Sequence, residues 1–133
     1  MASESLAITW RRIPERYRFE GTCCKACSTC FFPPRKICPK CRRKGKIEQT
    51  RFSGHGKVYS YTEVTAPPEG FELEAPYVLA IVQLEEGPKI TAQIVEAREA
   101  DVKIGDPVEM VFRKIKEDGE EGLIHYGFKF RKI

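Results

Sequence analysis

Residues 24–41 read CKACSTCFFPPRKICPKC, and the cysteines of this stretch decide how the first part of the chain folds. Two C-x2-C pairs, Cys24/Cys27 and Cys38/Cys41, are separated by ten residues, a spacing that brings four thiolates within reach of one tetrahedral zinc ion. Zinc bound by four sulfurs has no open position for water or substrate, whereas catalytic zinc usually keeps one. The spacing therefore predicts one structural Zn2+ in a zinc ribbon.

Two further cysteines allow a second register, because Cys27 and Cys30 also form a C-x2-C pair. Loop length favours Cys24/Cys27 as the first pair, since residues 28–37 can then hold a short strand, a Pro-Pro turn and a second short strand. The other register leaves only seven residues between the pairs. We therefore predict that Cys23 and Cys30 are free thiols.

The expected cellular compartment is inferred from the lack of an export signal and of a membrane-spanning segment in the sequence. A disulfide framework would need an oxidising compartment, but Met1 to Ala7 do not form the apolar region of an export signal. No run approaches 18 apolar residues, so no membrane-spanning helix is expected. We expect a cytoplasmic protein of 133 residues, with one domain or one small domain and an appendage.

Charge is divided unevenly along the chain. Residues 1–50 contain 12 Lys/Arg and 4 Asp/Glu, whereas residues 51–133 contain 11 and 15. The densest basic run, residues 42–46 (RRKGK), directly follows the last predicted zinc ligand. Because Lys and Arg neutralise phosphates, a nucleic-acid-binding module is the alternative function to be weighed.

Residues 1–20 form a polar, Arg-rich segment that predicts a short helix. Thr9 is a candidate N-cap, Ile13 and Tyr17 share one face, and Pro14 is tolerated only in the first turn. Such a segment cannot bury itself, and Trp and Arg are residues that anchor protein interfaces. It therefore binds a partner or packs on this protein's own ribbon.

The rest of the chain predicts a mainly β fold with a C-terminal five-stranded OB-fold barrel. Turn signals separate five strand candidates at residues 52–64, 76–84, 90–95, 108–115 and 124–130. A short helical connection fits residues 96–103, after the third strand, as in an OB-fold. Gly54 and Gly56 would let the first strand bend to serve both sheets. The expected units are residues 1–20, 21–46 and 47–133.

Catalytic patterns are missing from the sequence. The histidines are His55, between two glycines, and His125, beside Tyr126 in the last predicted strand. No nucleophile elbow, phosphate-binding glycine loop or paired-acid motif appears. We expect no enzymatic activity from this chain alone.

The order of the motifs resembles a known family that joins a rubredoxin-like zinc ribbon to an OB-fold. The resemblance rests on Cys24-x2-Cys27, the FFPPR segment at 31–35, Cys38-Pro-x-Cys41 and the stretch from Gly54 to Thr62. Trp10-Arg11 and the segment Ile104 to Val108 also match its landmarks, so the resemblance covers nearly the whole chain. Family members usually have Gly where this chain has Ser28 and Arg42.

The resemblance implies an accessory role in acyl-CoA metabolism. Archaeal proteins of this kind are similar to the subunit that holds acetoacetyl-CoA thiolase and hydroxymethylglutaryl-CoA synthase together at the start of the mevalonate pathway. We therefore expect a non-catalytic scaffold in a hetero-oligomer with these two enzymes. The expected partner-binding residues are Trp10, Arg11, Tyr17, Phe31, Phe32, Pro33, Pro34 and Arg35.

Overall fold

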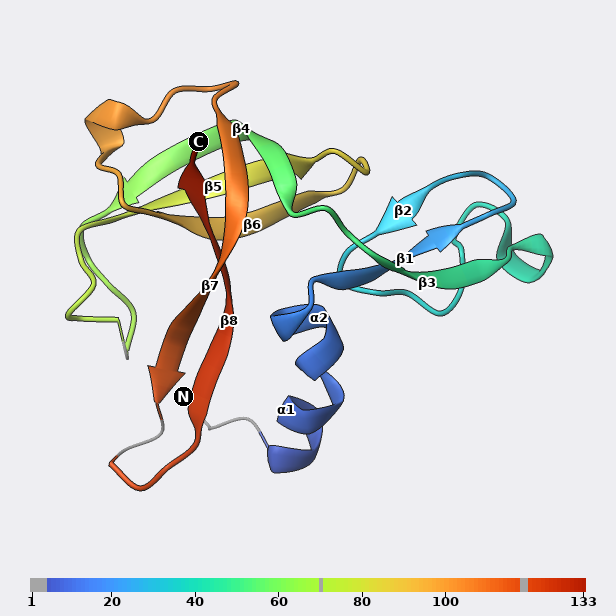
Figure 1. Cartoon of the computed structure of the whole chain (residues 1–133), viewed down its shortest axis with the longest axis horizontal. Helices are drawn as coiled ribbons and strands as arrows, with labels where there is room; N and C mark the ends of the chain where they lie inside the picture. Colours follow the sequence, from blue (N-terminus) through green and yellow to red (C-terminus); the bar gives the residue numbers. More distant parts are fainter. Residues whose placement is uncertain (1–4, 70, 118–119) are drawn as a thin grey trace.

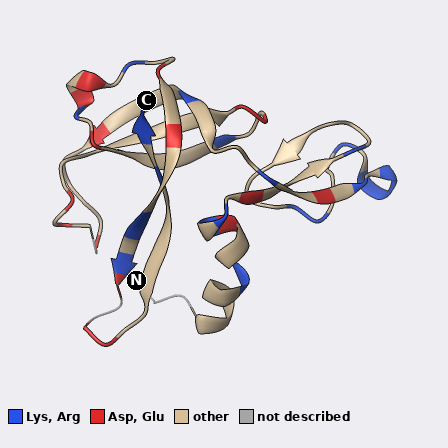
Figure 2. Ribbon diagram, viewed as in Figure 1, with Lys and Arg blue, Asp and Glu red and all other residues tan. Residues whose placement is uncertain are grey.

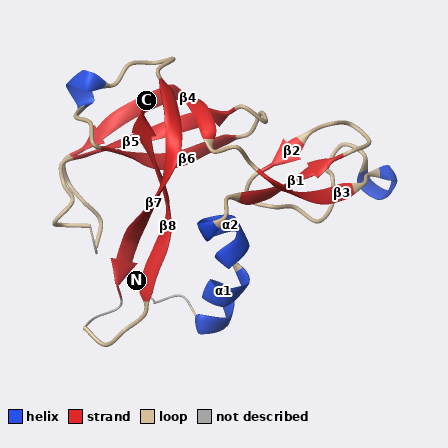
Figure 3. Ribbon diagram, viewed as in Figure 1, coloured by secondary structure: helices blue, strands red, loops and turns tan. Residues whose placement is uncertain are grey.

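The computed structural model describes residues 5–69, 71–117 and 120–133. It shows a mainly β protein with a short helical segment, a three-stranded ribbon and a closed barrel (Figure 1). This confirms the fold class predicted from the sequence. Helices are confined to the N-terminal segment and to two short 3-10 turns in the described residues (Figure 3).

The N-terminal segment forms two short helices, α1 (Leu6–Arg11) and α2 (Ile13–Tyr17). The N-cap of α1 is Ser5, whose Oγ accepts a hydrogen bond from the Ile8 N–H, so the predicted Thr9 cap is wrong. Pro14 lies in the first turn of α2, where it removes no helical hydrogen bond. Neither helix, nor any other in the described ranges, is long and apolar enough to cross a membrane.

The ribbon is an antiparallel sheet with the strand order β2-β1-β3. Its strands are β1 (Glu20–Cys24), β2 (Cys30–Phe31) and β3 (Ile47–Arg51). Strand β3 pairs with the whole of β1, from Glu20↔Arg51 to Cys24↔Ile47. The ribbon sheet therefore extends five residues beyond the boundary expected at residue 46, because strand pairing with β1 claims residues that the sequence pattern assigns to the barrel.

The barrel contains the five predicted strands, closed in the order β4-β5-β6-β8-β7. They are β4 (His55–Val64), β5 (Tyr77–Leu84), β6 (Lys89–Val95), β7 (Pro107–Glu117) and β8 (Ile124–Lys132). A 3-10 turn, η2 (Glu99–Asp101), lies between the third and fourth of them. Alternating residues such as Val78, Ala80, Val82 and Leu84 face inward and build the core.

Strand β4 is long and bent, and it closes the barrel by pairing with β5 on one edge and with β7 on the other. Gly54 precedes it at φ +82°, a value that L side chains rarely adopt. A Cβ on Gly56 would lie 2.7 Å from the Gln83 carbonyl oxygen, so glycine permits the close approach of β4 and β5. A bulge between Val58 and Ser60 completes the bend.

Five phenylalanines join the ribbon to the barrel. The ring of Phe19, which precedes β1, lies at centroid distances of 4.7 to 6.0 Å from the other four. These four come from the ribbon turn, the β3–β4 linker and β8, and they are Phe32, Phe52, Phe128 and Phe130. Their packing gives the two units a shared apolar contact.

Candidate metal centre and partner-binding residues

Four cysteines converge at the end of the ribbon. Cys24 ends β1, Cys27 follows in the next turn, and Cys38 and Cys41 precede the 3-10 turn η1 (Arg42–Lys44). Their Sγ atoms all lie within 4.8 Å of one another. Cys24 and Cys38 are fully buried, whereas Cys27 and Cys41 are half-buried. The structure thus brings together the four residues that the spacing predicts as ligands.

The two cysteine knuckles are built alike. The Ser28 N–H donates to the Cys24 carbonyl and the Arg42 N–H donates to the Cys38 carbonyl, each at 2.8 Å. Both donors have a positive φ, 60° for Ser28 and 51° for Arg42. These are the positions where the resembling family usually has glycine, which adopts this conformation without steric cost. The local fold therefore requires a left-handed residue after each knuckle.

The thiols affect one another's ionisation. A hydrogen bond between the Cys27 sulfur and the Thr29 hydroxyl lowers the pKa of Cys27 to about 6. Hydrogen bonding to Cys27, together with burial, raises the pKa of Cys41 to about 12. Four thiolates this close repel one another unless a cation is bound, and a divalent ion with tetrahedral preference suits four sulfur donors. The donor set fits structural zinc, and four sulfur ligands would leave no position on the ion for a reacting water.

Cys23 and Cys30 form a disulfide, so the prediction that they are free thiols is wrong. They lie directly opposite each other in the antiparallel β1–β2 pair. The sequence pattern does not show this pairing, because it depends on how β2 aligns with β1. The bond lies beside the four-cysteine cluster and uses none of its members.

Two of the expected partner-binding residues pack within the chain. Phe32 is half-buried among Phe19, Phe52 and Phe128. The Tyr17 ring meets Phe112 edge-on, with centroids 5.2 Å apart. Neither is an exposed anchor, and α2 packs on the barrel strand β8 as well as on the ribbon strand β1.

The other expected residues lie nearer to solvent. Trp10 is 77% exposed and Arg11 beside it is exposed. In the ribbon turn, Pro33, Pro34 and Arg35 are exposed and Phe31 is half-buried. The Arg35 guanidinium lies 5.5 Å from the centroid of the Phe31 ring, and the Arg35 N–H donates to Thr22 Oγ1 at 2.9 Å. The turn is thus held against β1.

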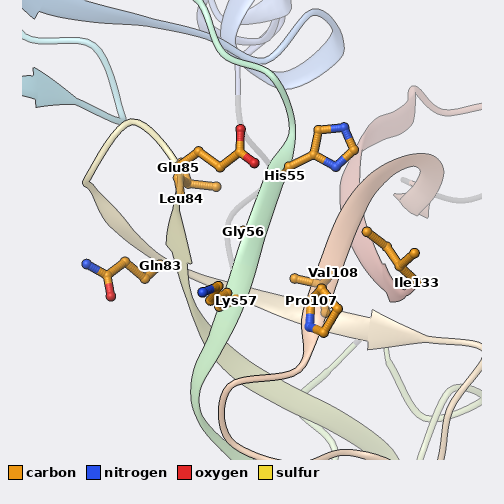
Figure 4. Close-up of a pocket in the computed structure, with 9 residues that line it drawn as sticks. All are labelled: His55, Gly56, Lys57, Gln83, Leu84, Glu85, Pro107, Val108 and Ile133. Atoms are coloured by element: carbon orange, nitrogen blue, oxygen red, sulfur yellow. The ribbon is translucent and has the colours of Figure 1, made fainter.

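The two histidines lie in different strands of the barrel, His55 in β4 and His125 in β8. His125 is buried in β8. His55 lies at a pocket of about 500 Å³ between β4, β5 and β7, beside Lys57 and Glu85 (Figure 4). The residues that line this pocket include no cysteine, serine or threonine that could serve as a nucleophile.

Sequence reasoning missed the linker contacts that position the ribbon. The Ser53 N–H donates to Glu86 Oε2 at 2.8 Å, and the Ser53 hydroxyl donates to Glu85 Oε2 at 3.1 Å. Both acids belong to the β5–β6 turn, 32 and 33 residues further along the chain. A turn signal at Glu86-Gly87-Pro88 was visible in the sequence, but its contact with the linker depends on barrel closure.

Family comparisons account for both units. Residues 11–47 match the family described as ChsH2, rubredoxin-like zinc ribbon domain. Residues 49–113 match the family described as ChsH2, C-terminal OB-fold domain. The two matches follow each other in the order of the two sheets described above.

Individual proteins extend these matches over nearly the full chain. A DUF35 domain-containing scaffold protein of Methanocaldococcus jannaschii is 56% identical over 94% of this chain and 89% of its own length. The benzoylsuccinyl-CoA thiolase subunit BbsA of Geobacter metallireducens is 29% identical over 86% of this chain and 74% of its own.

Among solved structures, the Ltp2-ChsH2(DUF35) aldolase contains a similar chain. Its TM-score is 0.69 at 28% identity, over 98% of this chain and 96% of that one. The sequence similarity and the shared architecture lead to one assignment. This chain belongs to the family of DUF35 domain-containing scaffold proteins, and its residues match a ChsH2 rubredoxin-like zinc ribbon followed by a ChsH2 OB-fold domain.

Proposed function

We propose that this protein is a non-catalytic scaffold subunit that links acetoacetyl-CoA thiolase to hydroxymethylglutaryl-CoA synthase in the mevalonate pathway. The observation that carries the proposal is its similarity, over nearly its whole length, to archaeal proteins named as scaffolds. A more distant relative is named as a subunit of a thiolase that acts on a CoA thioester. The proposed site of action is the cytoplasm, and the proposal therefore treats the Cys23–Cys30 bond as an exception to the rarity of disulfides in that compartment.

The cysteine cluster supports a structural part for the metal. We assign one Zn2+ to Cys24, Cys27, Cys38 and Cys41, whose sulfur atoms form a closed donor set. When bound, zinc supplies a crosslink between the two knuckles. The rest of the ribbon is held by backbone pairing and a disulfide, so the metal would fix the shape of the ribbon and take no part in chemistry.

A scaffold serves this pair of reactions because thiolase condensation is uphill. Immediate use of acetoacetyl-CoA by the synthase draws the first reaction forward. A subunit that binds both enzymes raises the effective concentration of the intermediate at the second active site, with no catalytic group of its own. The pocket beside His55 is lined by no cysteine, serine or threonine, and the proposal assigns it no catalytic part.

The test is capture of a tagged chain from native extract, followed by mass spectrometry. We expect both enzymes to be recovered, and flux from thiolase to synthase to rise when the subunit is added to the purified pair. The isolated chain should show no condensing activity. Recovery of nucleic acid instead, with binding that falls steeply as salt rises, would favour the alternative of a nucleic-acid-binding module.

A further inference from the structure

The Cys23–Cys30 disulfide lies at the strand of the ribbon that backbone pairing supports least. Strand β2 has two residues and pairs with β1 at two positions, Thr22↔Phe31 and Cys23↔Cys30. It is an edge strand, because the order in the sheet is β2-β1-β3. Strand β3, on the other side of β1, is paired with it over five residues. The disulfide therefore adds a crosslink where the sheet is weakest.

The segment that follows β2 depends on the same crosslink. Phe32, two residues after Cys30, packs among the phenylalanines that join the ribbon to the barrel. At the end of the FFPPR turn, the Arg35 N–H donates to Thr22 Oγ1 at 2.9 Å. Opening the disulfide would release the start of this turn from β1 and leave the rest held by ring packing and hydrogen bonds.

Neither sulfur of the disulfide belongs to the metal cluster, although both are close to it in the sequence. Cys23 directly precedes the predicted ligand Cys24, and Cys30 lies three residues after the predicted ligand Cys27. Cys23 and Cys30 are half-buried and pack against the apolar core. Half-burial leaves the bond within reach of a thiol from solution, and its opening removes no zinc ligand.

The surface around the disulfide is basic. Residues 22–46 contain eight Lys/Arg and no Asp/Glu. Figure 2 shows Lys and Arg concentrated at the loop end of the ribbon, around η1. Glu48 lies opposite Cys23 in β3, and its carboxylate pairs with Lys25 at 2.8 Å. Four thiolates on one divalent ion leave two negative charges, too few to offset this basic surface. The charge complements a reductant with a negative surface.

We propose that the Cys23–Cys30 bond is a reversible thiol–disulfide exchange site for an acidic dithiol reductant, and that its opening loosens residues 28–36 while zinc stays bound. Disulfides of cytosolic proteins are usually transient and redox-sensing, with the proteins of hyperthermophiles as the exception. The inference rests on the proposed function for the compartment alone.

The exchange takes two steps. A thiolate of the reductant attacks one sulfur of the Cys23–Cys30 bond and forms a mixed disulfide, and the other cysteine leaves as a thiolate that takes up a proton. The second thiol of the reductant then loses its proton and attacks its own sulfur in the mixed disulfide, which releases the remaining cysteine to be protonated in turn. Two electrons and two protons pass to the chain, and the reductant leaves as a disulfide.

The experiment exposes the full-length, zinc-loaded chain to rising ratios of reduced to oxidised dithiothreitol. Alkylation with mass spectrometry counts opened bonds, metal analysis counts zinc, and hydrogen–deuterium exchange follows the backbone. We expect one disulfide to open and re-form with the zinc content unchanged, and residues 28–36 to exchange about tenfold faster when it is open. Exchange in the barrel should not change. Cys23→Ser/Cys30→Ser is the matched control, and its residues 28–36 should exchange rapidly at every ratio.

Two small thiols of opposite charge test the expected charge of the reductant. At matched thiolate concentration and low salt, anionic 2-mercaptoethanesulfonate should open the bond about threefold faster than cationic cysteamine. The two rates should converge at high salt, because salt screens the basic surface. Equal rates at low salt would overturn the assignment of an acidic partner.

Three other results would overturn the proposal. A bond that opens only after the ribbon is denatured would be a permanent structural crosslink. Opening without faster exchange at residues 28–36 would show that the bond does not control this segment. Zinc release on opening, or a response to dithiothreitol that persists in Cys23→Ser/Cys30→Ser, would place the redox-sensitive group in the metal cluster. All of these measurements use the chain alone, so failure to capture thiolase and synthase would overturn the proposed function and leave this result unchanged.

Discussion

The ribbon and the barrel reach a fixed structure by different means. In the ribbon, residues 20–51, the only buried apolar side chains are Cys24 and Cys38. The barrel buries an apolar core contributed by all five of its strands. About 30 residues cannot bury enough surface to offset the chain entropy lost on folding, so the ribbon depends on crosslinks. A protein can therefore place a metal where a small unit needs support and leave the larger unit to the hydrophobic effect.

Removal of zinc should reveal the largest difference in stability between the two units. Cys27→Ser should lose the metal and unfold residues 20–51, because structural zinc contributes about 10 to 16 kcal/mol in small zinc domains. The barrel should stay folded. Heteronuclear NMR would show collapsed signals for the ribbon and dispersed signals for the barrel, and metal analysis would show one zinc per wild-type chain. Collapse of both units in one transition would contradict the division.

The junction between the units is the next place to test. Phe19 is 1% exposed and touches rings from both units, so Phe19→Ala should lower the free energy of unfolding by about 3 kcal/mol. We expect urea unfolding to change from one transition into two. Phe71→Ala is the control, since Phe71 lies in a loop and its ring centroid is 6.4 Å from that of Tyr77. This substitution should lower the free energy of unfolding by about 1 kcal/mol or less. Equal effects from both variants would contradict a coupling role for Phe19.

The same contrast explains what the sequence could predict. The five barrel strands were visible because period-2 alternation and turn residues are local signals. The four cysteines were visible because their spacing is local too. The Cys23–Cys30 bond was missed because it depends on the register of β2 against β1, which no short pattern specifies.

The other features could not be predicted, because they depend on contacts between residues far apart in the sequence. Residues 47–51 look like the beginning of the barrel until β1 is placed beside them. Phe32 looks like an exposed anchor in an FFPPR turn until Phe19 and Phe128 are placed around it. In both cases the decisive contacts join residues far apart in the sequence.

The disulfide should have a smaller effect than the metal. Cys30→Ser should lower the free energy of unfolding by about 2 kcal/mol, since the bond closes only a short loop between cysteines seven positions apart. It should leave the zinc content unchanged, because Cys30 is outside the four-sulfur cluster. Mass spectrometry after alkylation without reductant should find Cys23 and Cys30 protected in the wild type. Loss of zinc from Cys30→Ser would show that the ligand register is wrong.

The smallest effect concerns the residues that follow the two knuckles. Ser28 and Arg42 adopt positive φ, which costs an L-residue about 1 to 2 kcal/mol, whereas glycine adopts it freely but loses about 0.5 to 1 kcal/mol of chain entropy. Ser28→Gly and Arg42→Gly should therefore each stabilise the zinc-bound ribbon by about 0.5 kcal/mol. Ala26→Gly, in the same first knuckle but without a positive φ, should destabilise it instead. Zinc competition against a chromogenic chelator would measure these shifts as changes in apparent zinc affinity. Destabilisation by all three glycines would mean that the Ser28 and Arg42 side chains contribute more to the knuckles than their backbone strain costs.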